Sequence, residues 1–122
     1  GLLLEGALFP DNTTFVDEAQ TFTGTMGPSA ADLEIDRYPL TVGNDATTIK
    51  GKLSWTGALD IDLYLVDPNG VRVASAATSA NPETFEYVVR QPGGYTLEVT
   101  GFATLAASYT LIATVTRAIG AP

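Results

Sequence analysis

The stretch LDIDLYLVDPNG, residues 59–70, places two carboxylates one residue apart in a pattern typical of a β-strand. Successive side chains of a strand point to opposite faces, so Asp60 and Asp62 are predicted to share one face. Like charges on one face repel each other and weaken the strand unless water or a cation offsets them. Calcium prefers about six to eight oxygen ligands, which paired carboxylates and nearby loop carbonyl groups can supply. The pair is therefore predicted either to bind calcium or to form a solvated strand face.

Tyr64 lies on the same predicted outer face as the two aspartates. An exposed aromatic ring beside carboxylates could stack on a sugar or pack against a peptide rich in Lys and Arg. The alternative is ordinary cross-strand packing within the sheet. Tyr64 is therefore the candidate substrate-binding residue of the sequence.

Composition excludes most kinds of catalytic site. The 122 residues include no Cys and no His, which rules out cysteine nucleophiles, Ser–His triads, disulfides and thiolate or imidazole zinc sites. A pair of carboxylates that hydrolyses glycosides needs a concave site, whereas Asp60 and Asp62 are predicted on an open, convex face. We therefore expect a domain that is not an enzyme.

The charge balance also narrows the range of partners. The chain has 14 acidic and 6 basic residues, a net charge of −8, and no cluster of Lys and Arg. Neither a nucleic-acid partner nor a membrane partner is therefore expected, and the acidity favours a bound metal, a cationic partner or solubility alone. The opening GLLLEGALF is too short to span a bilayer and is interpreted as the start of a fragment of a longer chain.

The spacing of turn residues predicts an all-β fold. Runs rich in Val, Ile, Thr, Tyr and Phe alternate with Gly, Pro, Asn and Asp about every ten residues, as in antiparallel sandwiches and barrels. About eight strands are expected, which favours a two-sheet antiparallel β-sandwich of jelly-roll-like form. The predicted strands cover residues 19–25, 33–42, 48–55, 60–66, 71–76, 84–90, 94–100 and 108–116.

Individual residues refine this prediction. Alternation places Ile61, Leu63, Leu65 and Trp55 in the core, and Pro39 indicates an edge strand or a bulge. The expected organisation is a lead-in segment at 1–18, a β-sandwich accessory domain at 19–117 and a tail at 118–122.

From about Lys50 onward the sequence resembles a known family. The segments KLSWTGALDIDLYLVDPNGVRVASA, ETFEYVV, PGGYTLEVTGF and SYTLIATV, in this order, resemble the bacterial pre-peptidase C-terminal domain. They are also similar to the jelly-roll domains appended to subtilisin-like serine proteases. The resemblance extends over about residues 21–116 and is thin before Lys50.

This resemblance implies a non-catalytic accessory domain on the C-terminal side of a secreted serine protease or metalloprotease. Such domains often bind calcium and sometimes bind polymeric substrate, as do the related collagen-binding domains of bacterial collagenases. The implied partners are the catalytic domain of the parent protease and a protein substrate. Two alternatives stay open: a carbohydrate-binding β-sandwich module, which would show two or three coplanar exposed aromatic rings, and a purely structural module of a surface protein.

The resemblance also implies two sets of calcium ligands. In the first, Asp60 and Asp62 are joined by Glu83, which matches an acidic position of the related domains and is otherwise interpreted as a surface charge. The second set corresponds to the calcium site of the collagen-binding domains and comprises Asp11, Asn12, Asp32 and Asp36, with Pro10 also in a comparable place. The glutamates expected before the proline are replaced by Ala and Phe, which weakens this match. Asp32, Glu34 and Asp36 share one strand face, so a cation or plain solvation is expected there.

Overall fold

The structure is a computed structural model that describes residues 2–4, 7–9, 12–27, 33–56, 61–102 and 106–120. Every regular element within these residues is a β-strand. The described part of the chain contains no helix long and apolar enough to cross a membrane. The strands are β1 (Leu2–Leu4), β2 (Ala7–Phe9), β3 (Thr14–Met26), β4 (Leu33–Val42), β5 (Ala46–Trp55), β6 (Ile61–Val66), β7 (Arg72–Ala76), β8 (Glu83–Val88), β9 (Gly93–Phe102) and β10 (Ala107–Ile119).

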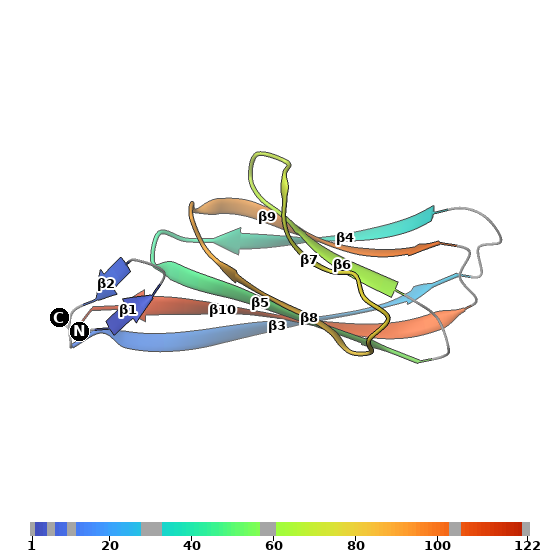
Figure 1. Cartoon of the computed structure of the whole chain (residues 1–122), viewed down its shortest axis with the longest axis horizontal. Helices are drawn as coiled ribbons and strands as arrows, with labels where there is room; N and C mark the ends of the chain where they lie inside the picture. Colours follow the sequence, from blue (N-terminus) through green and yellow to red (C-terminus); the bar gives the residue numbers. More distant parts are fainter. Residues whose placement is uncertain are drawn as a thin grey trace.

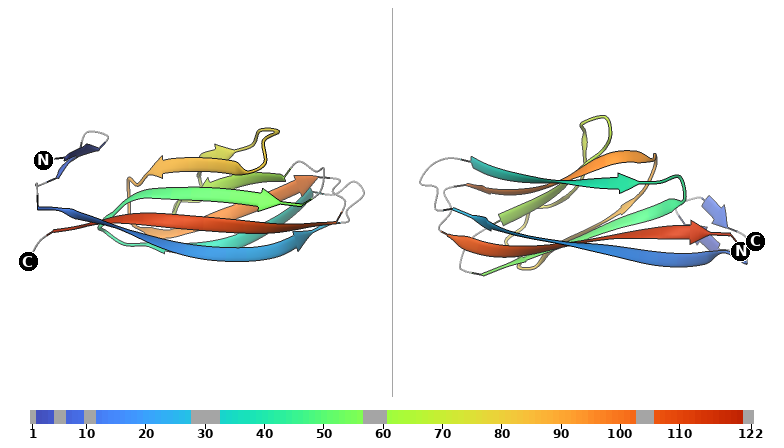
Figure 2. Two further views of the ribbon diagram at one scale, coloured as in Figure 1. Left: turned by 90° about the horizontal axis from the view of Figure 1, so that it is seen from below. Right: turned by 180° about the vertical axis from the view of Figure 1, so that it is seen from behind.

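Eight of these strands form two four-stranded antiparallel sheets packed face to face (Figures 1 and 2). The β3 sheet has the order β3-β10-β5-β8, and the β4 sheet has the order β4-β9-β6-β7. Every connection from β3 to β10 passes from one sheet to the other, except the β6–β7 hairpin. This connectivity is that of a jelly roll, so the predicted fold class is confirmed. Strands β1 and β2 form a separate two-stranded sheet.

The first long strand is longer than predicted. Strand β3 begins at Thr14 rather than Ala19, and its pairing with β10 runs from Met26 opposite Ala107 to Thr14 opposite Ile119. Most side chains between Thr14 and Thr21 are exposed, so no alternation of apolar and polar residues marks this part of the strand. Its extended conformation therefore depends on backbone pairing with β10, which local sequence does not reveal.

Two local predictions are confirmed. Pro39 lies in β4, an edge strand of its sheet, where the missing N–H can face away from the single neighbouring strand. The sequence DPNG forms the turn between β6 and β7, in which the Asp67 carboxylate accepts hydrogen bonds from the backbone N–H groups of Asn69 and Val71. Gly70 has φ of +82°, a conformation that glycine adopts without steric cost.

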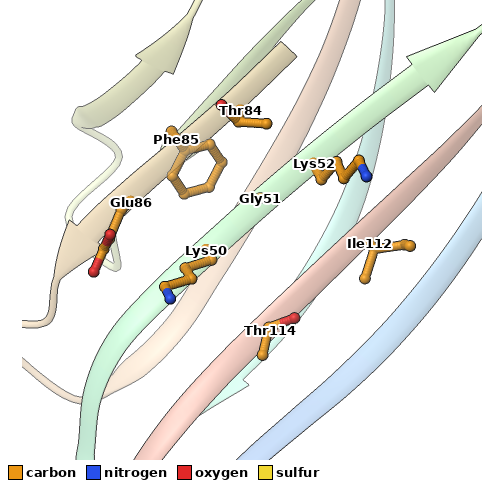
Figure 3. Close-up of a pocket in the computed structure, with 8 residues that line it drawn as sticks. All are labelled: Lys50, Gly51, Lys52, Thr84, Phe85, Glu86, Ile112 and Thr114. Carbon is orange, nitrogen blue, oxygen red and sulfur yellow. The ribbon is translucent and has the colours of Figure 1, made fainter. Parts of the chain in front are cut away.

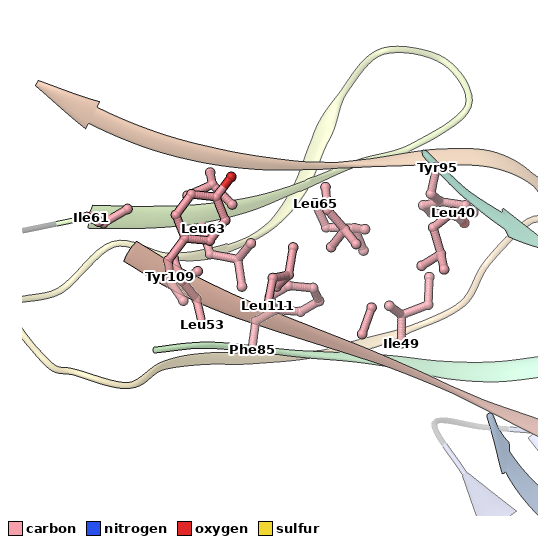
Figure 4. Packing of buried hydrophobic residues seen from close by; sticks show 14 of the residues in the cluster. Leu40, Ile49, Leu53, Ile61, Leu63, Leu65, Phe85, Tyr95, Tyr109 and Leu111 are labelled. Carbon is pink, nitrogen blue, oxygen red and sulfur yellow. The ribbon is translucent and has the colours of Figure 1, made fainter. Parts of the chain in front are cut away.

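The core lies between the two sheets and follows the predicted alternation (Figure 4). Ile61, Leu63 and Leu65 of β6 are each 0% exposed, and Trp55 of β5 is 8% exposed. Complete burial of one such aliphatic side chain stabilises a fold by about 1.5–3 kcal/mol. The residues between them on β6 therefore point to the outer face, where the predicted site lies.

Candidate functional site

The predicted site is on the outer face of the β4 sheet. Asp62 and Tyr64 alternate with the buried residues of β6 and are half-buried, so their predicted outward orientation is confirmed. Asp62 is paired with Thr100 of β9, and Tyr64 is paired with Glu98 of the same strand. Asp60, the other half of the predicted carboxylate pair, lies outside the described residues.

The ring of Tyr64 is covered by an arginine of the neighbouring strand. The guanidinium carbon of Arg72 lies 3.8 Å from the centre of the Tyr64 ring, which is cation–π geometry. The same guanidinium binds Oε1 of Glu98 through Nε at 3.1 Å and Nη2 at 3.0 Å. Cross-strand packing thus occupies one face of the tyrosine ring, the alternative that the sequence left open.

Glu98 is the centre of a charged cluster that joins all four strands of the sheet. Its second carboxylate oxygen accepts a hydrogen bond of 3.0 Å from Nε of Arg37 on β4. Glu98 is 8% exposed, whereas the side chains of Arg37 and Arg72 are 59% and 48% exposed. We call Arg37, Glu98, Arg72 and Tyr64 the Glu98 cluster. Two cations and one anion leave it with a net positive charge in a strongly acidic chain.

Sequence reasoning missed the Glu98 cluster. Residues 37, 72 and 98 are far apart in sequence, and no motif connects them. The one available signal was alternation, because Glu98 lies between the buried residues Leu97 and Val99 on β9 and must therefore point outward. Which arginines it meets depends on the register between strands that are distant in sequence, and no local sequence pattern specifies that register.

Glu83 is not a surface charge, so that interpretation was wrong. The residue is 1% exposed and, at the start of β8, points to the same inner face as the core residue Phe85. Its carboxylate accepts hydrogen bonds from the backbone N–H of Thr78 at 3.1 and 3.2 Å and from the Thr78 hydroxyl at 2.6 Å. Several hydrogen bonds are what a buried carboxylate requires. Glu83 therefore fixes the loop between β7 and β8.

Asp36 and Glu34 do not form a solvated strand face, which corrects a second interpretation. Both are half-buried on the side of β4 that faces the other sheet, the same side as the buried Leu40. Both carboxylate oxygens of Glu34 accept from the backbone N–H of Gly27, at 2.9 and 3.1 Å. Asp36 accepts a hydrogen bond of 2.6 Å from the hydroxyl of Tyr109 on β10. These carboxylates therefore link the edge strand β4 to the other sheet.

The hydroxyl of Tyr109 is held in its protonated form. Burial, reinforced by the hydrogen bonds to Asp36 and Tyr38, raises the pKa of Tyr109 far above its ordinary value. The Tyr38 and Tyr109 hydroxyls are themselves hydrogen-bonded to each other. Tyr109 consequently remains a donor to Asp36 throughout the neutral range.

The described residues do not by themselves complete a calcium site. Among them, no three Asp or Glu side chains gather closely enough to hold a metal ion. Asn12 is an exposed turn residue, and both Glu83 and Asp36 already accept hydrogen bonds. Asp11, Asp32 and Asp60 lie outside the described residues, so each proposed ligand set depends on at least one of them.

Exposed aromatic rings are not a feature of the described surface. Each Phe, Tyr and Trp whose side chain the structure describes is buried or half-buried. Tyr64, the aromatic residue singled out from the sequence, is covered on one face by Arg72. The described part of the chain therefore offers no coplanar pair of exposed rings for stacking on a sugar.

Several solved structures share the fold, including the following three. The pre-peptidase C-terminal domain of Bacillus anthracis collagenase has a TM-score of 0.58 and 14% identity, over 76% of this chain and 87% of that chain. The Yersinia pseudotuberculosis-derived mitogen has a TM-score of 0.55 and 18% identity, over 82% of this chain and 87% of that chain. The Aeromonas hydrophila inhibitor of g-type lysozyme, PliG, has a TM-score of 0.50 and 11% identity, over 89% of this chain and 92% of that chain. At these identities the likeness establishes the fold alone.

Sequence comparison identifies the family. The profile of the bacterial pre-peptidase C-terminal domain matches residues 34–101, more than half of the chain. The match runs from the second residue of β4 to the penultimate residue of β9 and includes the Glu98 cluster. The chain therefore belongs to the bacterial pre-peptidase C-terminal domain family.

Proposed function

We propose that this chain is a non-catalytic accessory domain of a secreted bacterial protease, which it stabilises and helps to bind protein substrate. The observation that carries the proposal is the family match over residues 34–101. The jelly-roll fold shared with the corresponding domain of a collagenase supports it. The partners under this proposal are the catalytic domain of the parent enzyme and a polymeric protein.

The outer face of the β4 sheet is the surface that we assign to protein substrate. Arg37 and Arg72 anchor to Glu98, yet their side chains are about half exposed and retain guanidinium donors on the solvent side. Peptide carbonyl groups are suitable acceptors for such donors. Tyr64 positions Arg72 by stacking, so its role in substrate binding is to orient this guanidinium.

Calcium binding forms the second part of the proposal. Asp62 projects from the outer face of β6, and the sequence pattern predicts the same side for Asp60. These carboxylates, together with loop oxygens, would coordinate a calcium ion. The charge of the ion would offset the repulsion between the two carboxylates. The second set, Asp11, Asn12, Asp32 and Asp36, is the alternative location, and in that case Tyr109 would orient the Asp36 carboxylate.

The accessory role can be tested by deleting the domain from the parent enzyme. Deletion of residues 19–117 should leave kcat/KM for a short chromogenic peptide unchanged, because the active site lies outside this domain. The same deletion should weaken binding to an insoluble protein substrate and lower the temperature of half-inactivation. Loss of short-peptide hydrolysis in a deletion variant whose catalytic domain remains folded by circular dichroism would show that the domain is not accessory.

Two substitutions in the full-length parent separate substrate binding from stabilisation. Tyr64→Ala frees Arg72 from the stacked position and should weaken binding to the insoluble substrate. Val16→Ala replaces an exposed residue of the edge strand β3 on the other sheet and serves as the matched surface control. Equal binding by wild type and Tyr64→Ala would remove the outer face of the β4 sheet from the proposal.

A carbohydrate-binding module is the less well supported alternative. Stacking on sugars needs exposed aromatic rings, and the described aromatic side chains are buried or half-buried. Binding of the isolated chain to xylan or cellulose, with no binding to gelatin, would favour this alternative over the protease accessory role.

A further inference from the structure

Two lysines differ from most of the other basic residues because they lack an acidic partner. Arg37 and Arg72 bind Glu98, and Arg117 binds Asp45 at 2.6 Å. Among the described residues, no carboxylate lies within ion-pair distance of Lys50 or Lys52. In a chain of net charge −8, these are two cations on one strand face without an ion-pair contact to a described carboxylate, and Glu86 is opposite Lys50 in register.

Both lysines project from the outer face of the β3 sheet, on the side opposite the Glu98 cluster. They alternate on β5 with Ile49, Gly51 and Leu53, which are buried. Strand β5 is a central strand of its sheet, with β8 on one side and β10 on the other. The lysines therefore stand in the middle of a broad sheet face and not at its edge.

The lysines border a shallow hollow of about 470 Å³ (Figure 3). On the β8 side its outer wall consists of Thr84 and Glu86, and on the β10 side it consists of Ile112 and Thr114. Ile112 is opposite Lys52 in register and is 36% exposed, unlike the core residues of β10. The hollow thus combines two cations, one carboxylate, two hydroxyl groups and the apolar side chain of Ile112.

The spacing of the cations indicates the shape of a ligand. Side chains two residues apart on a strand are separated by about 6.6 Å, the same repeat as alternate side chains of any extended peptide. A peptide that lies along β5 with carboxylates at positions i and i+2 would bring one to Lys50 and one to Lys52. The hydroxyl groups of Thr84 and Thr114 can donate to, or accept from, the backbone of that peptide.

We propose that the outer face of the β3 sheet around Lys50 and Lys52 binds an extended, acidic protein segment with Asp or Glu at alternate positions. Charge complementarity favours an anionic partner, and the match to the strand repeat favours a polypeptide. Glu86 is paired with Lys50 in register and opposes binding of the carboxylate at that position. This site is on a different sheet from the proposed substrate surface and does not depend on the proposed function.

The probe is a fluorescein-labelled decapeptide of alternating Glu and Thr, and binding is followed by fluorescence anisotropy at low ionic strength. Lys50→Gln and Lys52→Gln should each weaken binding about twofold to fivefold, the range expected for exposed ion pairs. Glu86→Gln should strengthen binding by a similar factor. Arg90→Gln changes the net charge equally, lies beyond the end of β8 and should leave the affinity unchanged. Amide chemical shifts should change along β5, β8 and β10.

Four results would overturn the proposal. The first is no binding of the Glu-Thr peptide, and the second is equal binding of a peptide with Gln in place of Glu. The third is equal loss of affinity in Arg90→Gln, because binding would then follow net charge alone. The fourth is tighter binding of a heparin-derived tetrasaccharide at the same lysines, which would assign the face to anionic polysaccharide.

Discussion

The hydroxyl of Tyr109 on β10 donates a hydrogen bond of 2.6 Å to the carboxylate of Asp36 on β4, and this contact joins the two sheets of the sandwich. The hydroxyl of Tyr38 on β4 is also hydrogen-bonded to the Tyr109 hydroxyl, and both hydroxyls lie close to the edge strand β3. Gly24 of β3 is opposite Tyr109, and a Cβ atom there would overlap both tyrosine hydroxyls. Glycine at position 24 therefore makes room for a polar connection between the sheets.

Tyr109→Phe should lower the free energy of unfolding by about 1–3 kcal/mol, because the half-buried Asp36 carboxylate loses its donor. Urea denaturation followed by tryptophan fluorescence measures the change. Tyr64→Phe is the matched control, since its ring remains over Arg72, and it should change stability by less than about 0.5 kcal/mol. Equal stability of wild type and Tyr109→Phe would show that the hydrogen bond contributes nothing net.

Alkaline pH should destabilise the fold through its buried tyrosines. Burial, and then the neighbouring Tyr87, raise the pKa of Tyr95 to about 12, and burial also raises the pKa of Tyr109. The unfolded chain releases these protons near pH 10, about the ordinary tyrosine value, while the folded chain retains them. Their contribution is therefore complete below about pH 10 and is lost as the pH rises to about 12 for Tyr95.

The urea midpoint should thus fall steeply above about pH 10, and Tyr95→Phe and Tyr109→Phe should each reduce that slope. Between neutral pH and about pH 9 these tyrosines should contribute no pH dependence. The same slope in wild type and in both variants would contradict the assignment of alkaline unfolding to Tyr95 and Tyr109.

Gly51→Ala should destabilise the core by about 1–3 kcal/mol, the usual range for overpacking. Gly51 is opposite Phe85 in the β5–β8 pair, and a Cβ atom at position 51 would clash with the edge of the Phe85 ring. Gly94→Ala is the control, because no atom lies within 4 Å of the position that its Cβ would occupy. The double variant Gly51→Ala with Phe85→Leu should be closer in stability to Phe85→Leu alone than additivity predicts.

Calcium should raise the melting temperature by several degrees, because the ion would bind the folded chain and not the unfolded chain. Mass action stabilises by about 2.7 kcal/mol at one hundred times the dissociation constant. Magnesium should have a smaller effect, since it gives up its water ligands reluctantly. Differential scanning calorimetry in calcium and in chelator measures the difference.

Replacement of both Asp60 and Asp62 with Asn should abolish most of the calcium-dependent increment. Asp36→Asn is the matched variant for the alternative site. If Asp36→Asn removes the increment and the double variant retains it, the ion binds with Asp11, Asn12 and Asp32. Identical melting temperatures of wild type in calcium and in chelator would leave Asp60 and Asp62 without a metal-binding role.

Features of the fold that depend only on residues adjacent in sequence could be predicted from the sequence. The burial of Ile61, Leu63 and Leu65 follows from a two-residue period, and the DPNG turn follows from the backbone preferences of Pro, Asn and Gly. Pro39 indicates an edge strand or a bulge because proline lacks the N–H that a central strand needs, and β4 is an edge strand. Each of these signals is local, so no knowledge of the partner strands was required.

Partners on other strands were decided by the tertiary structure. Glu98 meets Arg37 and Arg72 because β9 lies between β4 and β6, with β7 beyond β6. Glu83 is buried although carboxylates are seldom buried without several hydrogen bonds, and its donors belong to a loop whose conformation alternation does not specify. The sequence determined which face each side chain occupies, whereas the register of long-range strand pairing determined what it meets there.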